Sequence, residues 1–311
     1  MGYAYPVVLN GVIYTYQDYI LYGTTVNAIN VVNGDIIWQK RDWETIFTPP
    51  TDINNVIYVP NDRGITAWNA KDGTKIWHQY KPSYAPPAVV NGVVYTVTTG
   101  VVFALKAKDG IELWNYTTNS YSSMSSSPAV ANGVVYTSSD RNQKVCALDA
   151  KNGSLLWTFK TAGIVNTTPV VANGIIYIGS DDHNLYALNA KTGKEIWHYQ
   201  TGGKVGSPTV EYGVVYVGSN DQNIYAINAN TGKKIWTYNT NNNVINKPAI
   251  ANGVVYITTN YGDPTFYALS AATGEKLWTH PGAYGPPIIT DNKIYITSGS
   301  NVYAFSTITP Q

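Results

Sequence analysis

A tryptophan that recurs about every 40 residues is the feature that most constrains the fold of this chain. Its seven copies are spaced by 39, 37, 43, 40, 39 and 42 residues: Trp38, Trp77, Trp114, Trp157, Trp197, Trp236 and Trp278. Each copy has an alanine ten residues before it and a glycine four residues before it, as in ALNAKTGKEIW (187–197). A fixed period of this length is typical of repeat folds, in which each unit buries its apolar face against the next.

A second repeated pair runs in phase with the tryptophans. A proline is followed eight residues later by a tyrosine, in eight copies that begin at Pro6, Pro50, Pro87, Pro128, Pro169, Pro208, Pro248 and Pro287. In five of them an Asn-Gly turn separates two β-branched runs, which favours a type I′ hairpin. A polar turn then leads to a third run, and a turn such as Lys-Thr-Gly leads to a fourth run that contains the tryptophan. Antiparallel strands A to D in units of about 40 residues predict an all-β fold made of β-propeller blades.

The tryptophans are interpreted as packing residues rather than as a ligand cage. Strand D is expected to be the outermost strand of each blade, so its inward residues face the neighbouring blade. An indole there buries a wide apolar area, and the small alanine and glycine allow a close approach.

The last unit departs from this pattern. Strand A begins at Pro287, strand B runs through Tyr295 and strand C through 302–306. The tryptophan expected after Ala304 would lie beyond Gln311, so we expect an eighth blade without its outer strand. Met1–Tyr5 is too short to supply that strand and aligns with the loop before strand A. An open sheet edge of this kind is available for pairing with another chain.

Composition and charge exclude several classes of function. Charged residues make up 13% of the chain and the formal net charge is +1. Such a chain lacks the basic surface by which proteins bind nucleic acid through bulk charge. No run of apolar residues is long enough to span a membrane, and the N-terminus has no signal-peptide pattern. One cysteine, Cys146, rules out an intramolecular disulfide and a zinc site built from cysteines.

The Ala-x-(Asp/Asn)-x-x-x-Gly-x-x-x-Trp motif resembles the tryptophan-docking repeat of the pyrroloquinoline-quinone (PQQ) repeat propellers, and the resemblance covers residues 3–306. It implies eight blades around a central channel, forming one domain over residues 1–311 with blades that start near 6, 50, 87, 128, 169, 208, 248 and 287. The family includes quinoprotein alcohol dehydrogenases. It also includes non-enzymatic members, such as the outer-membrane assembly lipoprotein and extracellular domains of bacterial kinases. We expect the chain to belong to the non-enzymatic branch.

Catalytic chemistry has little support in the residues. The resemblance implies that a quinoprotein dehydrogenase would hold its cofactor with a disulfide of adjacent cysteines, a calcium ion and a catalytic aspartate, and this chain has no adjacent cysteines. The four histidines show no metal-ligand spacing, and aspartates in the B–C turns are interpreted as caps of their own backbone. We therefore expect no cofactor, no metal and no catalytic residue. A quinone-dependent dehydrogenase remains the alternative.

The candidate binding residues gather in the loops of one end of the blades. B–C and D–A loops share that end, and the D–A loops vary most in length and sequence, as functional loops on a rigid scaffold do. Arginine and aromatic residues are enriched at binding hot spots. The candidates are Arg41, Trp43, Phe47, Arg63, Tyr84, Tyr121, Arg141 and His183, with Tyr80 and Tyr116 among the further aromatics.

This pattern predicts a scaffold that binds a protein, a peptide or a glycan through the B–C/D–A loops. The competing interpretation is a plain solvated loop surface on which the aromatics pack against loop backbone. The low charge, the richness in Asn, Thr and Tyr and the resemblance together favour an extracytoplasmic location.

Overall fold

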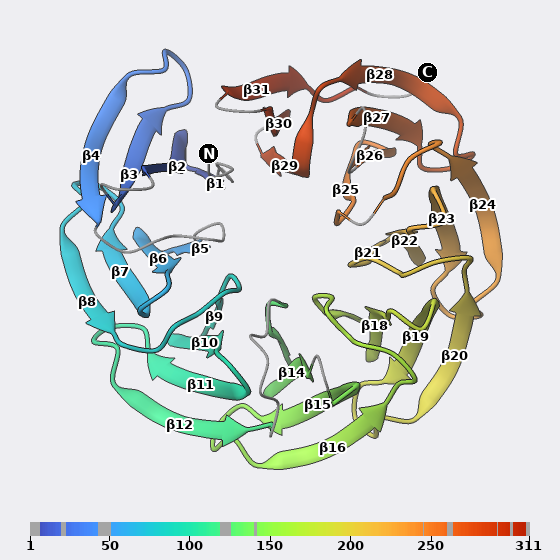
Figure 1. The fold of residues 1–311 in the computed structure, drawn as a ribbon, viewed down its shortest axis with the longest axis horizontal. Coiled ribbons are helices and arrows are strands. Elements are labelled where there is room, and N and C mark those ends of the chain that lie inside the picture. The colour runs from blue at the N-terminus through green and yellow to red at the C-terminus, as the bar shows by residue number, and fades with distance from the viewer. Residues whose placement is uncertain are drawn as a thin grey trace. The chain divides into compact units, whose positions relative to one another are not determined.

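Each repeat forms one antiparallel sheet, and the eight sheets make this chain an eight-bladed β-propeller (Figure 1). The computed structural model describes residues 7–19, 23–42, 51–118, 126–139, 142–244, 246–259, 264–290, 292–298 and 301–308, and these contain strands and turns but no helix. The chain divides into two compact units, residues 1–142 with 148–156 and residues 143–147 with 157–311.

The first unit contains blades 1 to 3 and part of blade 4. Blade 1 consists of β1 (Val7–Leu9), β2 (Val12–Tyr19), β3 (Gly23–Asn30) and β4 (Ile36–Asp42). Blade 2 consists of β5 (Thr51–Ile53), β6 (Val56–Pro60), β7 (Ile65–Asn69) and β8 (Lys75–Gln79). Blade 3 consists of β9 (Ala88–Val90), β10 (Val93–Val97), β11 (Val101–Lys106) and β12 (Glu112–Thr117). Blade 4 consists of β13 (Ala129–Ala131), β14 (Val134–Ser139), β15 (Lys144–Asp149) and β16 (Leu155–Lys160).

The second unit contains the remaining blades. Blade 5 consists of β17 (Val170–Ala172), β18 (Ile175–Gly179), β19 (Asn184–Asn189) and β20 (Glu195–Gln200). Blade 6 consists of β21 (Thr209–Glu211), β22 (Val214–Gly218), β23 (Asn223–Asn228) and β24 (Lys234–Asn239). Blade 7 consists of β25 (Ala249–Ala251), β26 (Val254–Thr258), β27 (Thr265–Ser270) and β28 (Lys276–Pro281). Blade 8 consists of β29 (Tyr284–Thr290), β30 (Lys293–Ser298) and β31 (Asn301–Ser306).

The hairpins that open the blades have the predicted backbone geometry. Asn173 and Gly174, between β17 and β18, have φ values of 49° and 75°. The other four Asn-Gly pairs also have positive φ at both residues. Two consecutive left-handed residues define the type I′ turn, whose twist matches that of the flanking strands.

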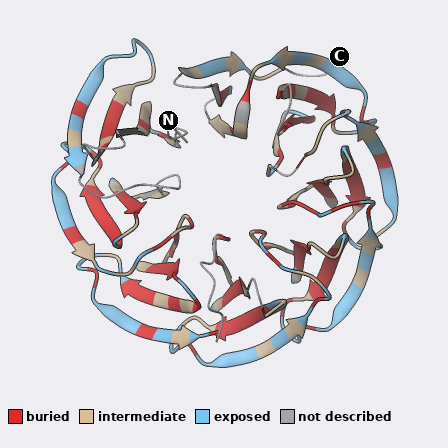
Figure 2. Cartoon of the chain, viewed as in Figure 1, coloured by how far each residue is buried: buried red, intermediate tan, exposed pale blue. Residues whose placement is uncertain are grey.

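Burial follows the strand order within each sheet (Figure 2). The second and third strands are mostly buried, as in β18 and β19, while residues on β20 are exposed or half-buried. The repeat alanine in the third strand, such as Ala187, is fully buried and pairs with the tryptophan of the fourth strand. Next to this pair the register shifts at a β-bulge, because Leu188 pairs with Glu195 and Ile196 has no partner in the register. Ile196 is 45% exposed.

The tryptophan links one blade to the next through its ring nitrogen. Trp197 donates a hydrogen bond of 3.0 Å from Nε1 to the carbonyl oxygen of Ala229 in blade 6. The repeat tyrosine Tyr177 donates to the same carbonyl, also at 3.0 Å. Equivalent indole bonds of 2.8–3.1 Å join blades 1 to 2, 2 to 3, 3 to 4, 4 to 5 and 6 to 7. Six of the seven repeat tryptophans therefore pack between blades as predicted, and the seventh, Trp278, has its ring centroid 5.6 Å from that of Phe305 in blade 8.

The repeat glycine makes this contact possible. A Cβ atom placed on Gly73, in the β7–β8 turn, would lie 2.7 Å from Cε3 of Trp38. The corresponding glycines of blades 3 to 7 would each bring a Cβ within 2.5–2.8 Å of the preceding tryptophan ring. Gly73 also has a φ of +65°, which disfavours any residue with a side chain. Both steric facts therefore require glycine at this position.

Within the described residues, the eighth blade has three strands in the order β29–β30–β31, as predicted. Among the described residues, β31 pairs only with β30, through six consecutive residue pairs. Met1–Tyr5, which the sequence predicts to be too short to supply a fourth strand, lies outside the described residues.

Replacing Gly73 by alanine is expected to destabilise the protein more than replacing Gly34, its counterpart in blade 1. Both glycines have positive φ and donate the same turn hydrogen bond from their backbone amide, but no described atom lies within 4 Å of a Cβ on Gly34. Gly34→Ala should cost about 1–2 kcal/mol of unfolding free energy from backbone strain, and Gly73→Ala about 1–3 kcal/mol more from the clash with Trp38. Urea unfolding measures both values, and equal losses would contradict the glycine–indole contact.

Candidate functional site

Four of the eight predicted binding residues lie in the described part of the chain. Arg63 and His183 are exposed in the β6–β7 and β18–β19 turns, and Tyr84 is half-buried in the β8–β9 connection. Trp43, Phe47, Tyr121 and Arg141 lie outside the described residues.

Arg41 corrects one expectation. The repeat pattern predicts that Arg41 lies in the D–A loop after blade 1, but the structure places it in β4, where it is exposed and pairs with Thr25. The reason is that β2 and β3 have eight residues each, so antiparallel pairing carries β4 through Asp42.

The β6–β7 turn of blade 2 packs directly on the end of β8. The buried side chain of Asn61 accepts hydrogen bonds through Oδ1 from the backbone amides of Arg63 (3.1 Å) and Gly64 (2.5 Å). A Cβ on Gly64 would lie 1.9 Å from the carbonyl oxygen of Gln79. Because this contact is backbone to backbone, the turn holds Arg63 in a defined place.

The start of the β8–β9 connection presents an exposed aromatic residue next to this contact. Tyr80 is 80% exposed, and its ring meets that of His78 edge-on, with centroids 4.5 Å apart. His78 is itself positioned by Thr66, whose Oγ1 lies 2.8 Å from Nδ1. We call Arg63, Tyr80 and Tyr84 the blade 2 loop surface. An exposed tyrosine and arginine on a rigid support are suited to binding a partner.

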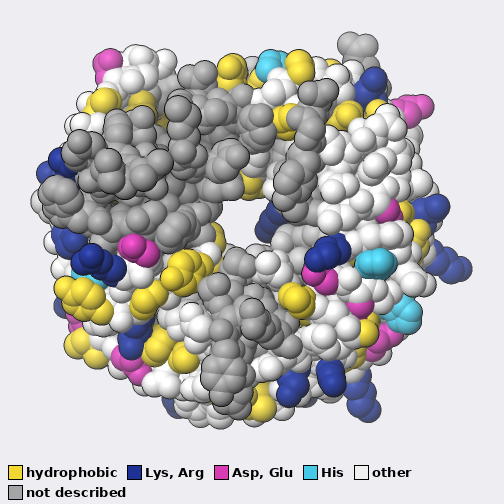
Figure 3. Space-filling model, in the orientation of Figure 1, with side chains coloured by type: hydrophobic (Ala, Val, Ile, Leu, Met, Phe, Trp, Pro, Cys, Tyr) yellow, Lys and Arg dark blue, Asp and Glu magenta, His cyan; other side chains and the backbone are white. Residues whose placement is uncertain are grey.

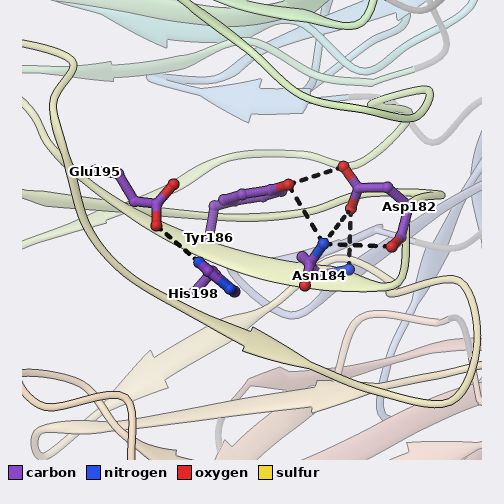
Figure 4. A network of polar contacts seen from close by, with 5 residues as sticks. All are labelled: Asp182, Asn184, Tyr186, Glu195 and His198. Carbon is purple, nitrogen blue, oxygen red and sulfur yellow. Dashed lines mark hydrogen bonds and ion pairs between the residues drawn. The ribbon is translucent and has the colours of Figure 1, made fainter.

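Two repeated aspartate networks hold the equivalent loops in blades 5 and 6. Figure 4 shows the carboxylate of Asp182 facing the hydroxyl of Tyr186 and the amide of Asn184. Tyr186 donates to Asp182 at 2.9 Å, and the backbone amide of Ala162 donates to it at 2.9 Å. Asp221 accepts the same two kinds of bond, from Tyr225 at 2.7 Å and from the amide of Gly202 at 2.7 Å. Asp182 and Asp221 also accept bonds from the backbone amides of Asn184 (3.0 Å) and Asn223 (3.1 Å), so these two aspartates cap the backbone of their own turns, as predicted.

The ionisation of Asp182 follows from these contacts. Burial raises the pKa of the carboxyl, but the hydrogen bonds from Tyr186, Ala162 and Asn184 outweigh burial and hold the pKa below its ordinary value. Burial and the bond to Asp182 raise the pKa of Tyr186. The pair is therefore a structural contact between a carboxylate and a neutral phenol.

His183 is presented by the same turn. It is exposed and has a φ of +74°, and its carbonyl oxygen lies 3.1 Å from Oγ1 of Thr201. His198 on β20 is also exposed, and its Nδ1 lies 2.7 Å from Oε1 of Glu195 (Figure 4). These contacts join neighbouring residues of one blade and form no catalytic arrangement.

The residues present do not match those that a quinone cofactor would need. Cys146 is alone and buried in β15, and burial raises the pKa of its thiol to about 11, so it stays protonated at neutral pH. Within the described ranges, no three His, Cys, Asp or Glu side chains gather as metal ligands. The described part of the chain also has no helix long and apolar enough to cross a membrane.

A cleft that the sequence did not indicate lies at the opposite ends of blades 2 and 3. Its volume is about 380 Å³, and its walls come from strands β5, β6 and β9 and from A–B and C–D turns. The lining residues are Ile53, Asn54, Val56, Tyr58, Val89, Asn91, Gly92, Ala107 and Lys108. No sequence signal marks this cleft, because it depends on how two blades meet.

On the face drawn in Figure 3, lysine, arginine and acidic side chains are interspersed, so positive and negative charges do not form separate patches there.

Comparison with known proteins places the chain in a family. The model of the family described as outer membrane protein assembly factor BamB matches residues 4–122 and 201–309. A comparison with curated proteins finds no match.

Solved structures share the fold at low sequence identity. BamB from Moraxella catarrhalis aligns with a TM-score of 0.81 and 20% identity over 96% of this chain and 95% of that one. The computationally designed protein Ika8 aligns with a TM-score of 0.83 and 13% identity over 98% and 96%. The quinohemoprotein alcohol dehydrogenase ADHIIG from Pseudomonas putida HK5 aligns with a TM-score of 0.74 and 14% identity over 96% of this chain and 70% of the enzyme. These identities establish a common fold and nothing more specific.

Asp182→Asn should lower stability near neutral pH and remove part of its pH dependence. Because the folded-state pKa of Asp182 is depressed, its contribution is present above the ordinary pKa of aspartate and is lost as the pH falls through the folded value. The difference in unfolding free energy between native protein and variant should therefore shrink in acid. Urea unfolding at several pH values measures it.

Asp181→Asn is the matched control, because Asp181 makes a surface ion pair with Lys204, a kind of contact that contributes little. A difference for Asp182→Asn that stays constant down to strongly acidic pH would contradict the role of the carboxylate.

Proposed function

Because this chain belongs to the PQQ-repeat propeller family described as outer membrane protein assembly factor BamB, we propose that it is a non-catalytic module that binds another protein. The family description names an assembly factor, a role that depends on contacts between proteins. We take residues 1–311 as one propeller domain that acts outside the cytoplasm. A peptide and a glycan are the other two classes of ligand that the arginine and tyrosines of these loops are suited to bind.

The observation that carries this proposal is the blade 2 loop surface. Tyr80 is 80% exposed, and burial of such a ring in a complex removes a large apolar area from water. Arg63 has five donors in a planar fork, which fits carboxylate and carbonyl groups of a partner. Asn61 and His78 hold the surrounding backbone and ring in place, so little conformational entropy is lost on binding.

The alternative, a quinone-dependent dehydrogenase, has the support of fold alone. The chain aligns with the dehydrogenase propeller but has a single, buried cysteine. Since one fold hosts many functions, the residues of the site decide between them, and those present favour binding.

The first test of this proposal is loss of binding on truncation of the blade 2 loop surface. Tagged native protein would be cross-linked in an envelope extract of its source organism, and the captured protein identified and purified for titration. Arg63→Ala and Tyr80→Ala should each weaken that complex by about 2 kcal/mol, roughly thirtyfold in affinity, because each removes an anchor of the interface.

Lys71→Ala is the matched control, since Lys71 is exposed in the β7–β8 turn at the other end of the same blade. Lys191→Ala provides the same control in blade 5. Unchanged affinity in both loop variants, with circular dichroism showing an intact fold, would contradict the proposed surface.

The second test concerns catalysis. Purified protein supplied with PQQ and calcium should oxidise no primary alcohol above a blank without protein, because it cannot form the disulfide of adjacent cysteines that the dehydrogenases use. A dye-linked assay with ethanol measures this rate. Turnover proportional to protein concentration would overturn the non-catalytic assignment.

A further inference from the structure

The β21–β22 turn of blade 6 departs from the repeat at its first residue. In blades 1 to 5 and in blade 7 this residue is an asparagine with a φ of 48–54°. In blade 6 it is Tyr212, with a φ of 47°. Asparagine enters the left-handed region at low cost, whereas a bulky side chain there is a conformational outlier. Blade 6 therefore keeps the geometry of the turn but carries a residue that this geometry disfavours.

No contact within the described part of the chain offsets the strain at Tyr212. Its side chain is 92% exposed and makes no hydrogen bond or ring contact with a described residue. Strain that brings no packing benefit is characteristic of functional positions. The ring is thus displayed to solvent on a hairpin whose two strands pair through three consecutive residues.

The residue before this turn is also unlike its counterparts. Glu211, the last residue of β21, is half-buried. The other blades have an aliphatic residue or a threonine at this position: Leu9, Ile53, Val90, Ala131, Ala172, Ala251 and Thr290. No described lysine or arginine forms an ion pair with the Glu211 carboxylate. Burial raises the pKa of this carboxyl, as it does for an acid without a counter-ion.

Glu211 lies where blade 6 meets blade 7. It pairs with Val214 and therefore shares a face of the sheet with Tyr216. Burial and the charge of Glu211 raise the pKa of Tyr216. The hydroxyl of Tyr216 donates to the carbonyl oxygen of Ala271 in blade 7, at 3.2 Å. The carboxylate is thus close to the β27–β28 turn, which begins at this alanine.

The cleft between blades 2 and 3 shows what surrounds the equivalent position there. Glu211 corresponds to Ile53 in the wall of that cleft, and Ala272 of blade 7 corresponds to Lys108. Ala272 is exposed. The other counterparts keep the character of the lining: Val214, Tyr216, Ile250, Asn252, Gly253 and Ala271. The junction of blades 6 and 7 therefore gains a carboxylate and lacks the lysine that could neutralise it.

From these observations we propose that the β21–β22 and β27–β28 turns bind an arginine side chain of a partner protein. The Glu211 carboxylate accepts both arms of the guanidinium fork, and the exposed ring of Tyr212 offers a face on which the guanidinium stacks. The small side chain of Ala272 leaves room where blade 3 has a lysine. This arginine site belongs to blades 6 and 7, so it can be tested apart from the blade 2 loop surface.

The probe is the peptide acetyl-Gly-Arg-Gly-Arg-Gly amide, labelled with a fluorophore and titrated with the protein. We expect saturable binding by fluorescence anisotropy. The peptide with citrulline in place of arginine keeps the shape of the side chain without its charge and should bind about tenfold more weakly. No saturable binding, or equal binding of the two peptides, would overturn the proposal.

Glu211→Gln removes the charge at the site and keeps the size of the side chain. It should weaken binding of the arginine peptide about tenfold, because charge-assisted hydrogen bonds to the guanidinium are lost. Glu195→Gln is the matched control, since Glu195 is exposed on β20 and contacts His198 instead. Tyr80→Ala, in the blade 2 loop surface, should also leave peptide binding unchanged. Equal affinity of the two glutamine variants would contradict the proposed site.

Ala272→Lys fills the site from within the chain. The new ammonium group should pair with Glu211 and weaken peptide binding about tenfold. Val32→Lys adds the same charge at the corresponding turn position of blade 1, where Val32 is 86% exposed, and should leave binding unchanged. Equal effects of the two lysine substitutions would show a general charge effect and overturn the site.

Tyr212→Asn separates binding from structure. It restores the residue that six other turns use, so the variant should unfold at a higher urea concentration than the native protein. At the same time it should bind the arginine peptide about fivefold more weakly, because the stacking face is lost. A lower urea midpoint, or unchanged affinity, would mean that Tyr212 serves the fold and would overturn its role in binding.

Discussion

The contact between an indole and a glycine at positive φ holds neighbouring blades together within each unit. The tryptophan ring lies where any side chain on the glycine would have to be. Its Nε1 donates to the carbonyl three residues before that glycine, as Trp38 does to Ala70 before Gly73. Three local requirements follow from it: a left-handed turn, a small residue in the third strand and an aromatic residue in the fourth. The regularity of the repeat reflects these requirements, since blades 2 to 6 each present a glycine to the preceding blade and a tryptophan to the following one.

A frame held in this way leaves its loops free to differ. In blades 5 and 6 the loops are fixed by Asp182 and Asp221, which accept bonds from the preceding loop and from a tyrosine. In blade 2 the buried side chain of Asn61 holds the β6–β7 turn by accepting bonds from the backbone amides of Arg63 and Gly64. Arg63 in this turn and Tyr80 after β8 are exposed. The turn between the second and third strands thus binds the preceding loop in blades 5 and 6 and exposes an arginine in blade 2. Loops that differ on a common frame are where binding residues concentrate in such folds.

The family assignment separates fold from chemistry. A BamB structure, a designed protein and a quinohemoprotein dehydrogenase share this architecture with the chain at 13–20% identity. What they share is the strand arrangement, which follows from backbone geometry and apolar packing. A quinone site depends on a few residues added to that frame. The buried, protonated thiol of Cys146 has no adjacent cysteine with which to form a disulfide, and membership of the fold does not by itself decide the chemistry.

The sequence by itself determined the repeat, the four-stranded blades, the Asn-Gly turns, the docking role of the tryptophans and the three strands described for blade 8. These features are local. Each depends on backbone preference and side-chain size within about 40 residues, and the local sequence pattern indicates such preferences directly. Only the tertiary structure decided that Arg41 lies in β4 and that Tyr80 is exposed beside His78. It alone revealed the cleft between blades 2 and 3 and the exposure of Tyr212. Exposure and cavities depend on contacts between segments far apart in the chain, such as Gly64 against Gln79 or one blade against the next, and no local pattern specifies them.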